Sequence, residues 1–339
     1  MRRRTANLAG LALLVLAVGL LPEVLGTGRL FFWTTAIIAV LFATTVNLLF
    51  GVADIPSFGQ AAFFGAGAYT VAMLSPHSWS APLALLAGIG VAGGVACAAS
   101  LFTWRLTGLA FAMLTLAIAQ GMYTLVVKTD ALGGYNGLPG VVAPELGPLN
   151  LLDPTVFWYF TAACVALGLA AFWAVGRSPF GHTLRSIREN PSRAIYLGIN
   201  VRAYRALAFV IAGCGAGLAG GLSAYSNQIV TPGALYWTAS ATPIIMLLLG
   251  GRSYFWGPAI GAVVLSGLLD YLTEATTAYV FYVGLLLLAL LIFLPEGVLS
   301  LPRVLRRLAR RSRGPRPVDA GVPSVDAAPT DAAASGGRS

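Results

Sequence analysis

Ten apolar segments, separated by short polar stretches, dominate this sequence of 339 residues. A helix needs about 20 apolar residues to cross the hydrocarbon core of a bilayer, and most of these segments approach that length. Apolar residue types make up 58% of the chain and charged types only 10%, whereas a soluble domain carries about 25% charged residues. The sequence therefore predicts an all-α polytopic membrane protein, a bundle of about ten transmembrane helices. The predicted spans are residues 8–25, 30–50, 55–75, 82–103, 107–127, 155–175, 205–223, 238–251, 257–273 and 278–295.

The distribution of basic residues orients this bundle. Ten spans place both termini on the same side of the membrane. If that side is the cytoplasm, only Arg29 and Lys128 of the 21 Lys and Arg residues fall outside. Cytoplasmic loops carry the excess of positive charge in membrane proteins. We therefore expect both termini in the cytoplasm and the loop between the fifth and sixth spans on the outer face.

The two ends of the chain differ from the spans. The N-terminus has Arg2–Arg4 ahead of an apolar stretch, as a secretory signal does, but no clear small-residue cleavage site precedes Pro22. We expect a retained first span. Residues 1–300 are predicted to form the transmembrane domain. Residues 301–339 are first basic and then rich in Pro, Ala, Gly and Ser without a periodic apolar stripe, which predicts a disordered cytoplasmic tail.

Residues 176–204 form a basic, amphipathic insert on the predicted cytoplasmic side. From Arg177 to Arg205 the chain has six arginines and one acid. Apolar residues from Phe180 onward follow one helical stripe, and Asn190–Pro191 is a typical start for a second short helix, at about 191–197. Gly198 is a suitable left-handed stop. The insert is either a solvated linker or a docking element for a cytoplasmic protein; we expect the latter. The residues assigned to it are Phe180, Gly181, Arg185, Arg188, Glu189, Asn190, Pro191, Arg193, Ile195 and Gly198.

Several functional classes lack their sequence signatures. A nucleotide-binding P-loop needs a glycine directly before its lysine, but Lys128, the single lysine, follows Val127. There is no catalytic cluster, so we expect no enzymatic activity and no cofactor in this chain. The three cysteines lie inside apolar runs and the two histidines are far apart, which disfavours a metal site. The arginines occupy short loops between spans, so nucleic-acid binding is not expected despite a pI near 9.8.

Polar and small residues inside the spans indicate helix contacts or a path for a solute. Asn47, Gln60, Thr115 and Gln120 are uncharged polar residues within predicted spans. They either bond neighbouring helices or line a polar passage. Gly213, Gly217 and Gly221 recur every fourth residue, and the pairs Gly90/Gly94 and Gly257/Gly261 repeat that spacing. Such small-residue faces predict close helix packing.

Five motifs, in order along residues 30–300, resemble the permease family of the branched-chain amino-acid ABC importers, and specifically its M-type subunit. Residues 47–70 read NLLFGVADIPSFGQAAFFGAGAYT and resemble the early motif of the family. Residues 178–213 resemble its cytoplasmic loop that contacts the ATPase. Residues 247–262 (LLLGGRSYFWGPAIGA) and 293–298 (FLPEGV) resemble two later motifs, and residues 133–140 (GGYNGLPG) resemble its extracellular loop.

The resemblance implies an assembly and a set of site residues. The implied partners are a second homologous permease, two ABC ATPase subunits that bind ATP and Mg²⁺, and an extracytoplasmic solute-binding protein, in a bacterial inner membrane. The insert 178–200 would couple to the ATPases, and the solute-binding protein would face a loop that contains Gly133, Gly134, Asn136 and Gly137. We expect the solute path to contain Asn47, Gly59, Gln60, Gly65, Thr115 and Gln120.

Two departures from the family motif leave the solute open. Gln60 stands where the family usually has His, and Asp54–Pro56 replaces its usual turn. The expected cargo is a branched-chain or related hydrophobic amino acid. The alternatives are a related ABC importer of urea or short amides, and a secondary transporter that works without ATP.

Overall fold

The computed structural model describes residues 29–77, 79–103, 105–144, 150–252 and 254–275, together with residues 281, 282, 284, 285 and 288. Contacts divide the chain into two units, Met1–Leu301 and Pro302–Ser339, and the described residues all belong to the first. The predicted span 8–25, most of the span 278–295 and the predicted tail 301–339 lie outside the described residues.

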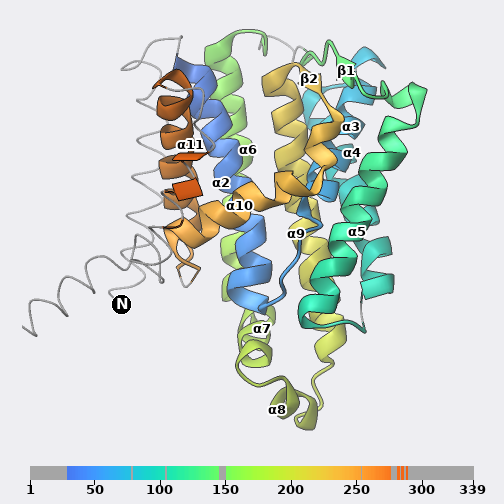
Figure 1. Ribbon diagram of the computed structural model, residues 1–339, viewed down its shortest axis with the longest axis vertical. Coiled ribbons are helices and arrows are strands. Elements are labelled where there is room, and N and C mark those ends of the chain that lie inside the picture. Colours follow the sequence, from blue (N-terminus) through green and yellow to red (C-terminus); the bar gives the residue numbers. More distant parts are fainter. Residues whose placement is uncertain are drawn as a thin grey trace, which may run out of the picture. The chain divides into compact units, whose positions relative to one another are not determined.

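The described part of the chain is a helical bundle (Figure 1). Two-residue strands β1 (Leu138–Pro139) and β2 (Ile229–Val230) pair antiparallel at one end of it, with Leu138 opposite Val230. The helices are α2 (Leu30–Val46), the π-helix η2 (Asn47–Ala53), α3 (Gln60–Leu74), η3 (Ser75–His77), α4 (Ala81–Thr103), α5 (Gly108–Val127), η4 (Asp130–Leu132), α6 (Pro154–Arg177), α7 (Pro179–Glu189), α8 (Pro191–Tyr196), α9 (Val201–Asn227), η5 (Pro232–Leu235), α10 (Trp237–Gly250) and α11 (Gly257–Ala275).

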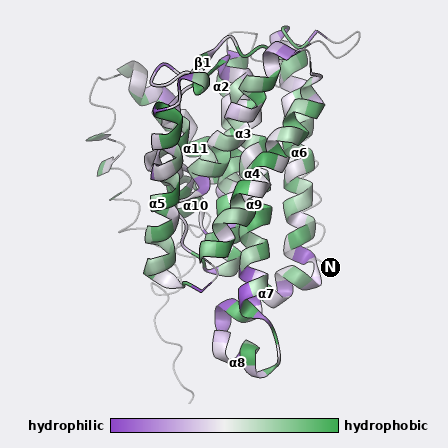
Figure 2. Ribbon diagram, turned by 90° about the vertical axis from the view of Figure 1, so that its right-hand side faces the viewer, coloured by the Kyte–Doolittle hydropathy of each residue, from purple (hydrophilic) through white to green (hydrophobic). Residues whose placement is uncertain are grey.

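Five helices in the described residues are long and apolar enough to cross a membrane: α2 with η2, α4, α5, α6 and α9. The prediction of a mostly helical membrane protein is confirmed. Figure 2 shows apolar residues along these helices and hydrophilic ones gathered on α7. The total of about ten spans and the cytoplasmic position of the termini stay predictions.

The predicted spans 55–75 and 238–251 differ from simple membrane-crossing helices. Residues 54–59 are irregular and helix α3 begins only at Gln60, so the prediction of a helical span from residue 55 was wrong. Asp54 is in the left-handed region, with φ 53°, and Pro56 lacks the amide donor that a continuing helix needs. Helix α10 has 14 residues, about 21 Å of rise, which is less than the roughly 30 Å bilayer core.

Helix α9 lies at the centre and packs most extensively against α3 and α4. Its glycines permit this contact: a Cβ on Gly217 would lie 2.4 Å from the Cβ of Ala92, and one on Gly213 would lie 2.5 Å from the Cβ of Ala96. The predicted close packing is confirmed for this helix. Gly90 and Gly94 make no such contact with the described residues, because a Cβ on either would meet none of their atoms within 4 Å.

Candidate functional site

Helices α7 and α8 form the predicted insert, and local side chains start both of them. The side chain of Ser178 accepts a hydrogen bond from the amide of Gly181 at 3.3 Å, and Pro179 occupies the first turn of α7. Asn190 accepts from the amide of Arg193 at 2.9 Å and so caps α8, as predicted. Gly198 has φ +80° and follows the end of α8. These side-chain caps satisfy amides that the first helical turn leaves without partners.

The insert has a small core of its own. Ile187, Ala194 and Val201 form a buried cluster that joins α7, α8 and the start of α9. The ring of Phe180 stacks on that of Tyr204, with centroids 5.4 Å apart. A Cβ on Gly181 would lie 2.5 Å from the carbonyl oxygen of Val175, so α7 folds back tightly against the end of α6. The insert is therefore a folded unit.

The tip of this unit carries exposed apolar side chains. Ile195 is 61% exposed, Tyr196 90% and Leu197 73%. Exposed large apolar residues that are contiguous mark interaction sites. Glu189 at the end of α7 and Arg193 on α8 are charged and also exposed.

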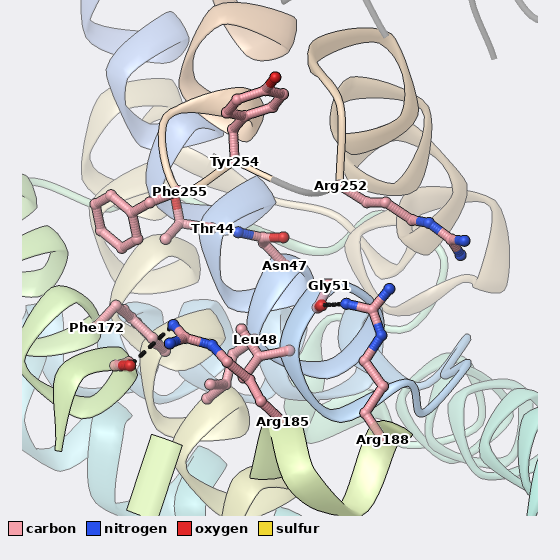
Figure 3. Close-up of a pocket in the computed structure, with 12 residues that line it drawn as sticks. Thr44, Asn47, Leu48, Gly51, Phe172, Arg185, Arg188, Arg252, Tyr254 and Phe255 are labelled. Carbon is pink, nitrogen blue, oxygen red and sulfur yellow. Dashed lines mark hydrogen bonds between the residues drawn. The ribbon is translucent and has the colours of Figure 1, made fainter. Parts of the chain in front are cut away.

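Two arginines of α7 turn towards the bundle (Figure 3). Arg185 Nη2 donates to the carbonyl oxygen of Gly176 at 2.9 Å, and Arg188 Nη1 donates to that of Gly51. Arg188 thus ties α7 to the π-helix η2. The side chain of Arg193 on α8 is exposed. A direct contact of any of these three arginines with a cytoplasmic partner stays a prediction.

Neighbouring helices hold the irregular segment 54–59 in place through two hydroxyl groups. Thr115 Oγ1 on α5 accepts from the amide of Phe58 at 3.2 Å and donates to the carbonyl of Ala112 at 2.9 Å. Ser240 Oγ on α10 accepts from the amide of Ala61 at 2.8 Å and donates to the carbonyl of Phe58 at 2.7 Å. Both side chains are fully buried. The start of α3 is therefore clamped between α5 and α10.

Gln60 is the first residue of α3 and has no accessible surface. Neither Oε1 nor Nε2 of its amide has a hydrogen-bond partner in the described part of the chain, and the same is true of Oδ1 of Asn47. Buried polar atoms without partners are rare and costly, so each needs an explanation. The amide of Gln60 therefore lies sealed at the positive end of α3 with no partner among the described residues, and its predicted place in a solute path stays a prediction.

The other predicted path residues separate into two groups. Gly59 and Gly65 provide space: a Cβ on Gly59 would lie 3.1 Å from the Cβ of Thr115, and one on Gly65 would lie 2.4 Å from Cδ2 of Leu235. Gln120 is half-buried on α5, the least buried of the five spans. The structure brings Gly59, Gln60 and Thr115 together, and it places Asn47 on η2.

The predicted outer loop lies at the end of the bundle opposite α7 and α8 (Figure 1). Gly133, Gly134 and Gly137 all have positive φ, and a Cβ on Gly137 would lie 2.1 Å from the carbonyl of Val230. Asn136 is exposed. The amide of Val141 donates to the carbonyl of Gln228 at 3.1 Å, so the loop is fastened to the connection between α9 and α10.

Sequence reasoning missed Ser57 and Ser240. The hydroxyl of buried Ser57 accepts from the amide of Gly59 at 3.2 Å, and Ser240 bridges Phe58 and Ala61. The only available signal was a serine in an apolar segment, and such serines commonly bond their own helix. A hydrogen bond between residues about 180 positions apart in the sequence leaves no local pattern that predicts it.

Comparison with known proteins points to transport. The family described as "Branched-chain amino acid transport system / permease component" matches residues 28–295. The chain is 26% identical over 320 residues to the high-affinity branched-chain amino acid transport system permease protein LivM of Escherichia coli K12, which covers 86% of this chain and 74% of that protein.

Two other relatives are also permease proteins of import or transport systems. The chain is 24% identical over 299 residues to the probable branched-chain amino acid transport permease protein LivH of Methanocaldococcus jannaschii, covering 80% of this chain and 92% of that protein. It is 28% identical over 259 residues to the autoinducer 2 import system permease protein LsrC of Shigella flexneri, covering 72% of each. No solved structure matches the chain significantly.

Proposed function

The chain belongs to the family of permease components of branched-chain amino-acid transport systems, and we propose that it is the transmembrane subunit of an ATP-driven importer of branched-chain or related hydrophobic amino acids. Its partners in this proposal are a second homologous permease, two ABC ATPase subunits that bind ATP and Mg²⁺, and an extracytoplasmic solute-binding protein. The assembly lies in a bacterial inner membrane. This chain itself performs no catalysis.

The α7–α8 unit is the observation that carries the proposal. It has its own small core, and it presents Ile195, Tyr196 and Leu197 at the end of the bundle opposite the outer loop. An exposed apolar tip on a unit that also exposes charged residues has the composition of a docking surface. Because Arg188 donates a hydrogen bond to Gly51 on η2, a displacement of α7 would be transmitted to η2, which leads into the irregular segment 54–59.

The solute path in this proposal passes the start of α3. Closure of the ATPases moves α7 and η2, and that movement exposes Gln60 between α5 and α10. The amide of Gln60 then bonds the solute weakly, because it offers two donors and one acceptor but no charge. The half-buried Gln120 and the exposed Thr124 extend a polar line along α5, where the second permease subunit would close the passage.

Gln60 also favours a second candidate cargo. An amide side chain with unsatisfied donors and an unsatisfied acceptor is complementary to urea or a short amide, which carry the same groups. A panel of radiolabelled leucine, isoleucine, valine, urea and acetamide separates the two candidates. An amino-acid importer would take up only the first three compounds, and an importer of urea or short amides only the last two.

Reconstitution tests the function. Sealed liposomes would contain this chain with its second permease and ATPases, and the solute-binding protein would be added outside. We expect leucine uptake that requires ATP on the ATPase side. Equal uptake in liposomes that lack the ATPases would reject the proposal in favour of a secondary transporter.

A further inference from the structure

A cavity of about 380 Å³ lies where η2, the end of α6, α7 and the turn between α10 and α11 meet. Its size falls within the roughly 300–1,000 Å³ range of small-molecule sites. The lining residues are Thr44, Asn47, Leu48, Gly51, Val52, Phe172, Gly176, Arg185, Arg188, Arg252, Tyr254 and Phe255. Three of them are arginines and none is an acid, so the cavity carries a concentrated positive charge.

The three guanidinium groups come from two separate parts of the chain. Arg185 and Arg188 belong to α7, and Arg252 belongs to the turn after α10. Figure 3 shows Arg188 and Arg252 on one side of Asn47 and Arg185 on the other. The hydrogen bonds from Arg185 and Arg188 to the carbonyls of Gly176 and Gly51 each use one nitrogen. A guanidinium has five N–H donors, so most of the donors stay available to an anion.

Asn47 is an independent sign of a ligand. Its side chain is 5% exposed and lines the cavity, and its Oδ1 has no partner among the described residues. It starts the π-helix η2, and such helices are rare and frequently occur at functional sites. An acceptor without a partner among the described residues, in a cavity that three arginines line, fits a ligand that is anionic and also carries a hydroxyl donor. A hydrogen phosphate or a glycerol phosphate has both groups.

We infer that this cavity binds a phosphate group, either as a free ion or as the headgroup of an anionic phospholipid. Arginine suits phosphate because its planar fork bonds two oxygens at once. Basic pockets between transmembrane helices on the cytoplasmic side bind anionic headgroups, and the three arginines lie on the side that the charge distribution assigns to the cytoplasm. The apolar neighbours Phe172, Leu48 and Val52 would contact the glycerol end of a lipid.

The bound phosphate has a mechanical consequence. It joins α7 to the turn between α10 and α11 and to η2, so the α7–α8 unit is held against the bundle. This inference concerns the cavity alone and does not depend on which solute is transported.

Ligand-induced shifts in the thermal unfolding midpoint of the purified full-length chain test the inference. The probes are inorganic phosphate, dihexanoylphosphatidylglycerol, dihexanoylphosphatidylcholine and leucine. We expect phosphate or phosphatidylglycerol to raise the midpoint, and phosphatidylcholine, which has no headgroup hydroxyl, to have little effect. A response at lower concentration to phosphatidylglycerol identifies the lipid as the source, and one at lower concentration to inorganic phosphate identifies the free ion.

Two variants locate the binding. Arg252→Gln removes one exposed guanidinium, and we expect about tenfold weaker binding or more, the factor for one hydrogen bond to a charged group. Arg177→Gln is the matched control, because Arg177 is on the same side, is exposed and lies over the ring of Trp173 rather than in the cavity. The affinity of Arg177→Gln for the phosphate probes should equal that of the native chain. The inference is overturned if neither phosphate probe shifts the native chain, if both variants respond as the native chain does, or if leucine alone produces the shift.

Discussion

The contact between α9 and α3 predicts a large effect for a single added methyl group. A Cβ on Gly220 would lie 1.8 Å from the carbonyl oxygen of Phe64 and 2.7 Å from its carbonyl carbon. A backbone carbonyl in a helix cannot rotate away, so in Gly220→Ala the two helices would separate by roughly 1.5 Å to restore an ordinary contact.

The magnitude follows from two opposing effects. Overpacking costs about 1–3 kcal/mol, and displacement of a central helix belongs at the upper end of that range. Alanine has a better helix propensity than glycine by about 1 kcal/mol, which offsets part of the loss. We expect Gly220→Ala to be less stable than the native chain by about 2 kcal/mol.

Thermal unfolding in detergent, followed by fluorescence, measures this effect. Gly94→Ala is the matched control, because the same substitution on α4 adds a methyl group that meets no atom of the described residues within 4 Å. Its unfolding midpoint should stay constant or rise slightly, by the helix propensity alone. Equal midpoints for Gly220→Ala and Gly94→Ala would refute the reasoning that backbone contact at α9 organises the bundle.

Four further substitutions have distinct expected outcomes. Ser240→Ala leaves the amide of Ala61 and the carbonyl of Phe58 without their buried partner. We expect the free energy of unfolding to fall by about 1–3 kcal/mol for each group, measured as a lower unfolding midpoint. Ser240→Thr keeps a hydroxyl and should lose less stability. Gln60→Leu removes two buried unpartnered atoms, so the chain should become more stable while solute uptake falls; uptake at the native rate would contradict the proposed path. Asn190→Ala removes the cap of α8 and should cost about 1 kcal/mol of local stability, seen as faster amide hydrogen exchange in α8. In a chain whose native cysteines are replaced, Tyr196→Cys should react with a membrane-impermeant maleimide only from the cytoplasmic side. Reaction in intact cells would show that α8 lies on the outer side and would contradict the predicted orientation.

The long helices and the caps of the insert could be predicted because their signals are local. Each membrane-length helix has a continuous apolar run, and Asn190–Pro191 specifies a helix start within two residues. The left-handed position at Gly198 is likewise a property of one residue type. The structure agrees with each of these predictions.

The contacts between distant segments could not be predicted in the same way. Gly90/Gly94 and Gly213/Gly217 have identical spacing, but among the described residues the second pair closely approaches a neighbouring helix and the first does not. Arg188 is polar and lies in a basic segment, which favoured a surface role, yet its side chain bonds Gly51 inside the bundle. Which way a side chain points depends on where the helices pack, and the periodic pattern does not contain that information.

The central claim is that the α7–α8 unit receives the motion of the ATPases and passes it to the bundle. ATP-driven leucine uptake by the reconstituted complex of Tyr196→Asp tests it most directly, with Tyr196→Phe as the control that keeps the exposed ring. The account predicts that Tyr196→Asp loses most of its uptake and its ATPase subunits on purification, while Tyr196→Phe keeps both. Uptake and assembly at native levels in Tyr196→Asp would contradict the account.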